Sequence, residues 1–164
     1  MNWEQRVADL WEKSDHYSDE AFVATMDALV AELPPTDAAG VYERASAFDS
    51  TGHSDLAVPL YRQALQLGLN EDRRRQAVIQ LASSLRNLGA AGESATLLHA
   101  EQLRGSDELD DAISAFLALA LVDSGREREA VSMALLALSK HMTRYQRSLA
   151  NYARLLVTEA PGKS

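Results

Sequence analysis

The side chains that could do chemistry in this sequence are scattered rather than grouped. The four histidines, His16, His53, His99 and His141, lie far apart along the chain. None is spaced from a second histidine or a cysteine in the way that metal ligands are. We therefore interpret them as exposed or capping side chains, and we expect neither a metal site nor a cofactor.

Motifs of nucleophilic and phosphate chemistry are also missing. The serines lack a G-x-S-x-G elbow, and the sequence has no phosphate loop, no G-x-G-x-x-G and no H-E-x-x-H. Without cysteine there is no thiol chemistry and no disulfide framework. The 24 acidic residues are plentiful, but no two of them stand out as an acid/base pair. We therefore predict that the chain is not an enzyme, an interpretation that a buried carboxylate pair or a metal would reverse.

The overall charge argues against nucleic acid as a partner. The formal charge is −8 and the pI is near 4.9, whereas nucleic-acid binding normally needs a basic stripe. The short run Arg73-Arg74-Arg75 stands beside Glu71 and Asp72, and ion pairing on a helix surface explains it better. Neither a signal peptide nor a run of about 18 apolar residues occurs, so we expect no membrane contact and a cytoplasmic location.

A repeat in the sequence determines how these residues must be positioned. Alanines at one anchor position are followed eight residues later by leucines, and successive anchors are separated by 36, 38 and 35 residues. The anchors are Ala21, Ala57, Ala95 and Ala130, and the leucines are Leu29, Leu65, Leu103 and Leu138. A period of this size is typical of helical repeat arrays, in which each unit buries its apolar face against its neighbours.

Apolar periodicity and turn residues divide the chain into helical hairpins. We predict a single domain of about nine helices: a degenerate hairpin in residues 1–35, repeats in 36–70, 71–105 and 106–141, and a capping helix in 142–159. The turn at Leu88–Gly92 appears one residue longer than those at Gly52 and Gly125. Residues 113–122 are apolar almost all round, which predicts the least exposed helix. Residues 160–164 are expected to fray.

Aromatic residues gather near the amino terminus. Trp3, Trp11, Tyr17 and Phe22 are expected to pack between the first two helices. If either tryptophan were exposed instead, a surface for self-association would be plausible, because large exposed apolar patches mark interfaces.

The pattern resembles the tetratricopeptide repeat family. The resemblance is carried best by Ala45, Phe48, Gly52, Ala57, Tyr61 and Ala64, well by Ala118, Leu121, Gly125, Ala130 and Ala137, and less well by Ala82, Leu85, Gly89 and Ala95. Small residues in this signature let two helices approach, and the glycine makes the turn. The stretch Ser84–Gly89 is also similar to a small bacterial subgroup of unassigned role. The resemblance implies a right-handed α-solenoid of such hairpins, closed by the carboxy-terminal helix.

The same resemblance implies a binding surface. In this family the first helices of successive hairpins line a concave face where peptides usually dock. By position, that face would carry Tyr42, Ser46, Asp49, Ile79, Gln80, Ser83, Arg86, Asn87, Phe116, Leu119 and Asp123. The lysine and asparagine set that clamps chaperone tails in some relatives is absent from these helices, which disfavours that partner.

Three of these positions suggest a charged ladder. Asp49, Arg86 and Asp123 stand three, three and two residues before their turn glycines, so Arg86 could lie between two carboxylates. One interpretation is a structural ion-pair ladder, worth about 0–1 kcal/mol per exposed pair. The other is recognition of a carboxylate or peptide backbone by the planar donors of Arg86, with Asn87.

We therefore predict a non-catalytic scaffold that binds a protein segment in its groove. The alternative is a self-association module that forms a homodimer. The sequence does not identify the partner protein.

Overall fold

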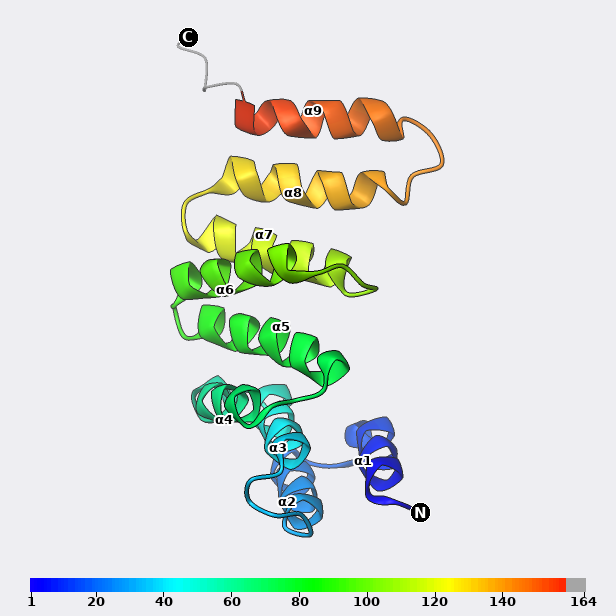
Figure 1. Cartoon of the computed structure of the whole chain (residues 1–164), viewed down its shortest axis with the longest axis vertical. Coiled ribbons are helices and arrows are strands. Elements are labelled where there is room, and N and C mark those ends of the chain that lie inside the picture. The colour runs from blue at the N-terminus through cyan, green and yellow to red at the C-terminus, as the bar shows by residue number, and fades with distance from the viewer. Residues whose placement is uncertain (159–164) are drawn as a thin grey trace. The chain divides into compact units, whose positions relative to one another are not determined.

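The chain is helical throughout its described part. The computed structural model describes residues 1–158, and these contain nine α-helices, one short 3-10 helix and no strand (Figure 1). The helices are α1 (Trp3–Glu12), η1 (Ser14–His16), α2 (Asp19–Val30), α3 (Ala38–Ser50), α4 (Ser54–Leu67), α5 (Glu71–Asn87), α6 (Ala91–Arg104), α7 (Asp110–Asp123), α8 (Glu127–Ser139) and α9 (Gln146–Thr158). The predicted array of helical hairpins is confirmed. The expected fraying of residues 160–164 lies outside the described residues.

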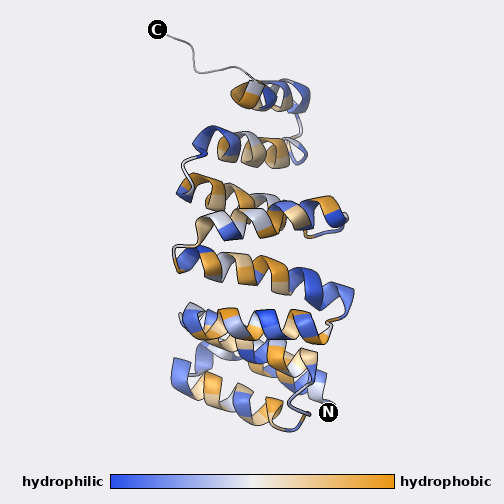
Figure 2. Ribbon diagram, turned by 60° about the vertical axis from the view of Figure 1, so that its left-hand side comes forward, coloured by the Kyte–Doolittle hydropathy of each residue, from blue (hydrophilic) through white to orange (hydrophobic). Residues whose placement is uncertain are grey.

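The chain divides into two compact units, residues 1–84 and 85–164. In the first, α2 packs on α3 and α3 on α4; in the second, α6 packs on α7, α7 on α8 and α8 on α9 (Figure 1). Each helix carries both apolar and polar residues, interspersed along its length, as the helical periodicity predicted (Figure 2). No helix in residues 1–158 is long and apolar enough to span a bilayer. The single domain over residues 1–164 and its internal boundaries stay predictions.

The amino-terminal core contains three of the four predicted aromatic residues, whereas Tyr17 is exposed. Phe22 and Met26 are buried with Val7 and Leu10, and Trp3 and Trp11 pack against them. The Trp11 ring meets Phe22 edge-on, with 4.9 Å between the ring centroids. Both tryptophans are therefore part of the core, and the condition set for self-association through them is not met.

The three turns inside the hairpins share one geometry. Gly52, Gly89 and Gly125 all have positive φ, between 72° and 84°, which glycine adopts without a steric penalty. In each turn the amide of the residue after the glycine donates to the carbonyl of the residue five positions earlier. These bonds join His53 to Phe48 at 2.9 Å, Ala90 to Leu85 at 2.9 Å and Arg126 to Leu121 at 2.8 Å. This six-to-one bond is the Schellman motif. Each turn leaves three residues between its helices, so the predicted extra residue at Leu88–Gly92 is wrong.

Equal turns move the anchor of the third copy by one residue. Ala57 and Ala130, each five residues after its glycine, are both almost fully buried. The equivalent residue after Gly89 is Ser94, which is 1 % exposed, so Ser94 rather than Ala95 holds the anchor position. The alanine pattern missed it because serine is nearly as small. With Ser94 as the anchor, Leu103 is no longer at the position equivalent to Leu65, and it is strongly exposed.

Ser94 should be a favourable site for a stabilising substitution. Its hydroxyl is buried and has no hydrogen-bond partner. Because alanine already fills the equivalent positions, Ser94→Ala is expected to raise the free energy of unfolding by about 1 kcal/mol. Urea denaturation followed by circular dichroism would measure this. The control Ser148→Ala changes an exposed serine of α9 and should leave stability within about 0.5 kcal/mol; a loss of stability in Ser94→Ala would contradict the argument.

The expectation that residues 113–122 form the least exposed helix is wrong. Helix α7 is not the least exposed helix, because Leu119 and Val122 on one of its faces are nearly half exposed, while α3 is buried along most of its length. An apolar sequence all round therefore does not require burial all round. Helix α9 buries Ala153 against the rest of its unit, but Tyr152 and Leu155 remain exposed.

Candidate functional site

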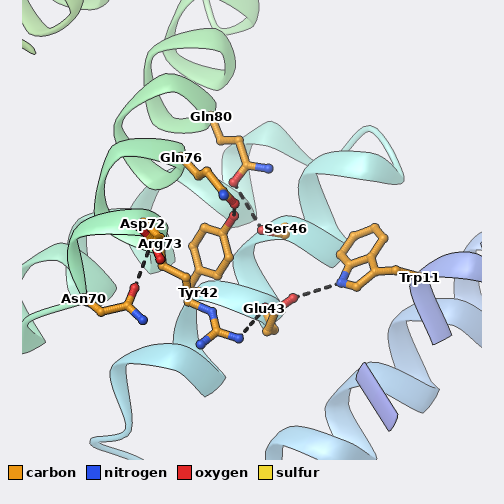
Figure 3. A pocket seen from close by; sticks show the side chains of 9 residues that line it. All are labelled: Trp11, Tyr42, Glu43, Ser46, Asn70, Asp72, Arg73, Gln76 and Gln80. Atoms are coloured by element: carbon orange, nitrogen blue, oxygen red, sulfur yellow. Dashed lines mark hydrogen bonds and ion pairs between the residues drawn. The ribbon is translucent and has the colours of Figure 1, made fainter. Parts of the chain in front are cut away.

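A polar pocket lies in the first unit between α1, α3 and the first turns of α5 (Figure 3). Its volume is about 470 Å³, within the range of small-ligand sites. The lining residues are Trp11, Tyr42, Glu43, Ser46, Asn70, Asp72, Arg73, Gln76 and Gln80. Asn70 starts α5 at this wall, since its side chain accepts from the Arg73 amide at 2.9 Å and caps the helix.

Two pairs of neutral side chains connect α3 to α5 across the pocket. The Tyr42 hydroxyl donates to Gln76 Oε1 at 3.0 Å, and Ser46 Oγ donates to Gln80 Oε1 at 3.3 Å (Figure 3). Burial raises the pKa of Tyr42 to about 12, so the hydroxyl stays protonated and remains a donor. These bonds hold both glutamine carbonyls toward α3 and leave both amide NH₂ groups as donors for a ligand.

A buried carboxylate joins α1 to the same pocket. Glu43 is only 6 % exposed, and Trp11 Nε1 donates to its Oε2 at 2.9 Å (Figure 3). Arg73 Nη2 lies 3.5 Å from Glu43 Oε1, and Nη1 and Nη2 of the same side chain donate to the Glu4 carboxylate of α1. Burial raises the pKa of Glu43, although the bond from Trp11 and the charge of Arg73 oppose this shift. Helix α1 therefore forms one wall of the pocket through side chains.

The raised pKa of Glu43 gives a test by pH. A carboxyl group whose pKa is higher in the folded state adds stability below its unfolded value, near 4.5, and this contribution is lost as pH rises through the folded-state pKa. Wild type should therefore lose stability relative to Glu43→Gln as the pH rises from 4 toward neutrality. Denaturation curves of both proteins across this range would measure the difference, with the exposed Glu12→Gln as control. A difference that is constant with pH, or that grows in favour of wild type, would contradict the assignment.

Some of the predicted site residues line this pocket, and the others lie elsewhere in the two units. Tyr42, Ser46 and Gln80 line the pocket. Ile79 is buried and offers little surface, Ser83 is half-buried, and Asn87 is exposed. In the second unit Phe116 is half-buried and Leu119 exposed.

The proposed charged ladder is present in part. Arg86 Nε donates to Asp123 Oδ2 at 2.7 Å within the second unit. In the first unit the Asp49 carboxylate accepts from Ser84 Oγ at 2.6 Å and lies 3.5 Å from the Tyr61 hydroxyl. The Arg86–Asp123 pair agrees with the structural interpretation. A role of Arg86 in recognition stays a prediction.

Sequence reasoning missed six of the residues that line the pocket. Gln76 stands four residues before Gln80, so helical spacing alone could have added it to the predicted face. Glu43 follows the chosen Tyr42, but the sequence does not show that α1 folds over it. Trp11, Asn70, Asp72 and Arg73 lie outside the helix segment used for the prediction.

The basic run takes part in ion pairs, and the histidines lie on the surface. Arg73 and Arg74 form ion pairs, as predicted for this basic run, but Arg75 is buried rather than on the surface. The four histidines are exposed, as expected. Within residues 1–158 no group of three histidine, aspartate or glutamate side chains is arranged to hold a metal ion.

Comparison with known proteins gives one match. The model of a family described as "Tetratrico peptide repeat" matches residues 38–156. The matched region begins at the first residue of α3 and ends inside α9, so it includes all three hairpins with Schellman turns. Neither the curated proteins nor the solved structures give a match.

Proposed function

Because the chain belongs to the tetratricopeptide repeat family, we propose that it is a non-catalytic scaffold that binds a protein segment along the polar pocket of its first unit. Proteins of this family generally mediate protein–protein interaction. The observation that carries the proposal is the pair of side-chain amide donors on α5, those of Gln76 and Gln80, which line the pocket between α1 and α3. The surface predicted on Arg86, Asn87, Phe116, Leu119 and Asp123 belongs to the second unit and stays a prediction. A cytoplasmic location remains a prediction.

The spacing of Gln76 and Gln80 suits an extended chain. Residues four apart on a helix rise by about 6 Å, while alternate residues of an extended strand repeat every 6.6 Å or so. Both NH₂ groups could therefore donate to backbone carbonyls two residues apart. Because backbone groups are common to all sequences, neighbouring pocket residues would supply selectivity. Tyr42 presents an aromatic ring beside the two amides, while Arg73, paired with Glu4 and Glu43, forms part of the pocket wall.

Selection from a displayed library of random dodecapeptides tests this proposal. Peptides enriched on the wild type should bind Gln76→Ala/Gln80→Ala about tenfold more weakly, because two hydrogen bonds are lost. The control Gln66→Ala/Gln102→Ala removes two exposed amides of α4 and α6 and should bind as wild type does. Melting curves of both variants would exclude unfolding as the cause. Enrichment of no peptide, or equal binding by both double variants, would contradict the proposal.

Self-association is the second candidate, and exposed apolar side chains of the second unit favour it. Leu103 of α6, with Val131 and Leu138 of α8, is exposed to solvent. Size-exclusion chromatography with light scattering at micromolar concentration would decide. A monomer there removes this candidate, and a dimer that Leu138→Glu dissociates supports it.

A further inference from the structure

Charge is distributed very unevenly along the sequence. Residues 1–129 carry 23 acidic and 11 basic side chains, a net charge of −12. Residues 130–158 carry four basic side chains, Lys140, Arg144, Arg147 and Arg154, and no acidic one. The segment of residues 130–158 is therefore a basic element in an acidic protein.

Three of these four cations have no acidic partner among residues 1–158. Lys140 Nζ lies 3.4 Å from Asp111 Oδ1, so its charge is compensated. Arg144, Arg147 and Arg154 are exposed and form no ion pair with any residue in the described range 1–158. Arg154 donates only to the neutral Asn151 side chain, at 3.2 Å. Elsewhere in the chain several exposed arginines have carboxylate partners, as Arg44 has Asp27 and Arg126 has Glu129.

The exposed half of α9 places apolar side chains next to these arginines. Tyr152 is 68 % exposed and Leu155 is also exposed, while Leu149, Ala153 and Leu156 turn inward. Successive residues of a helix are 100° apart around its axis. Viewed along the axis, Leu155 therefore lies between Tyr152 on one side and the two arginines Arg147 and Arg154 on the other. We call the set Arg144, Tyr145, Arg147, Tyr152, Arg154 and Leu155 the α9 surface. Tyrosine and arginine are the residues that protein interfaces enrich, together with buried apolar anchors.

The start of α9 adds an independent observation. Tyr145 precedes the helix, and its carbonyl accepts from the Leu149 amide at 2.9 Å. Its φ is +65°, the only positive value among the described non-glycine residues, and its side chain is 74 % exposed. A bulky residue in this conformation is disfavoured, and the exposed ring contributes little packing to offset that cost. Residues held in such backbone conformations cluster at functional sites.

We propose that the α9 surface binds an acidic protein segment that carries apolar side chains between its carboxylates. The three arginines supply charge complementarity and bidentate donors for carboxylates. Tyr145, Tyr152 and Leu155 supply the apolar contacts. The α9 surface is separate from the pocket of the first unit and does not depend on the function proposed for it.

Binding of a defined peptide to the full chain tests this proposal. The probe is a fluorescein-labelled dodecapeptide of four Glu-Asp-Leu units, followed by fluorescence anisotropy. Wild type should bind it with an affinity that falls as salt rises. The triple variant Arg144→Gln/Arg147→Gln/Arg154→Gln should bind the peptide about tenfold more weakly. Each exposed ion pair between an arginine and a peptide carboxylate contributes only part of that tenfold change in affinity. Tyr152→Ser should also weaken binding, and it leaves the charge unchanged.

Controls separate the α9 surface from net charge and from the pocket. Lys13→Gln/Arg44→Gln/Arg62→Gln changes the net charge equally and should bind as wild type does. Gln76→Ala/Gln80→Ala should also bind the acidic peptide normally, so failure of the pocket proposal would leave this result unaffected. The same melting curve for both triple variants would show that folding is retained.

Four outcomes would overturn the proposal. One is no binding of the peptide by wild type, and another is equal loss in the two triple variants. The third is binding of a single-stranded RNA dodecamer, or of vesicles with anionic lipid, as tight as that of the peptide. The fourth is salt-sensitive self-association that the α9 triple variant abolishes, since the occupant would then be a second copy of the chain.

Discussion

Replacing Tyr61 by alanine is expected to lower the free energy of unfolding by about 3–5 kcal/mol, the largest effect of any single change considered for this protein. Tyr61 is fully buried between α3 and α4, nine residues after the first turn glycine. Its ring lies 6.1 Å from that of Tyr42, and its hydroxyl donates to Ser46 Oγ at 3.3 Å. Burial raises its pKa far above the usual range, so this donor stays protonated at any working pH. The alanine variant loses the packing and leaves a cavity behind the pocket wall.

Two further variants divide this effect into its parts. Tyr61→Phe keeps the ring and removes only the hydroxyl, and should cost about 1 kcal/mol. Tyr152→Ala removes an exposed tyrosine of α9 and should change stability by less than about 0.5 kcal/mol. Urea denaturation followed by far-ultraviolet circular dichroism would give all three values. A loss below about 2 kcal/mol in Tyr61→Ala would show that the two helices repack around the cavity.

The fold could be predicted because its determinants are local in sequence. Each turn glycine needs a positive φ, and the small residue five positions later needs to be buried, so the repeat is visible without any tertiary information. The error at the third copy has the same origin. Ala95 matched by residue type, whereas the bond from the Ala90 amide to the Leu85 carbonyl fixes the register and places Ser94 inside.

The pocket could be predicted only in part because its contacts are far apart in sequence. Tyr42, Ser46 and Gln80 follow from helical position within the repeat. The contact of Arg73 with Glu4 joins residues 69 positions apart, and that of Trp11 with Glu43 joins residues 32 apart. Helix α1 is not related to the repeats by any sequence periodicity. Its position in the first unit depends on side-chain contacts with distant residues. Helix α1 is therefore the part of the site that required coordinates.

The other large effect is expected at Trp11, which connects α1 to the pocket. Trp11→Ala should lower the free energy of unfolding by about 2–3 kcal/mol, less than for a fully buried tryptophan because the side chain is half-buried. The substitution removes the edge contact with Phe22 and the hydrogen bond to Glu43. It leaves a buried carboxylate with Arg73 as its remaining partner, and it opens one wall of the pocket. Peptides selected on the wild type should consequently bind the variant more weakly.

Trp11→Phe separates packing from the hydrogen bond, because it keeps an aromatic ring against Phe22 and removes the indole N–H. Its cost should be about 1–2 kcal/mol, from the lost donor to a buried charged group. In a Glu43→Gln background this cost should shrink, because a neutral amide needs the donor less than a carboxylate does. A double-mutant cycle measures that coupling directly. A coupling energy near zero would mean that Trp11 holds α1 by packing alone and that the Glu43 carboxylate does not fix the wall of the pocket.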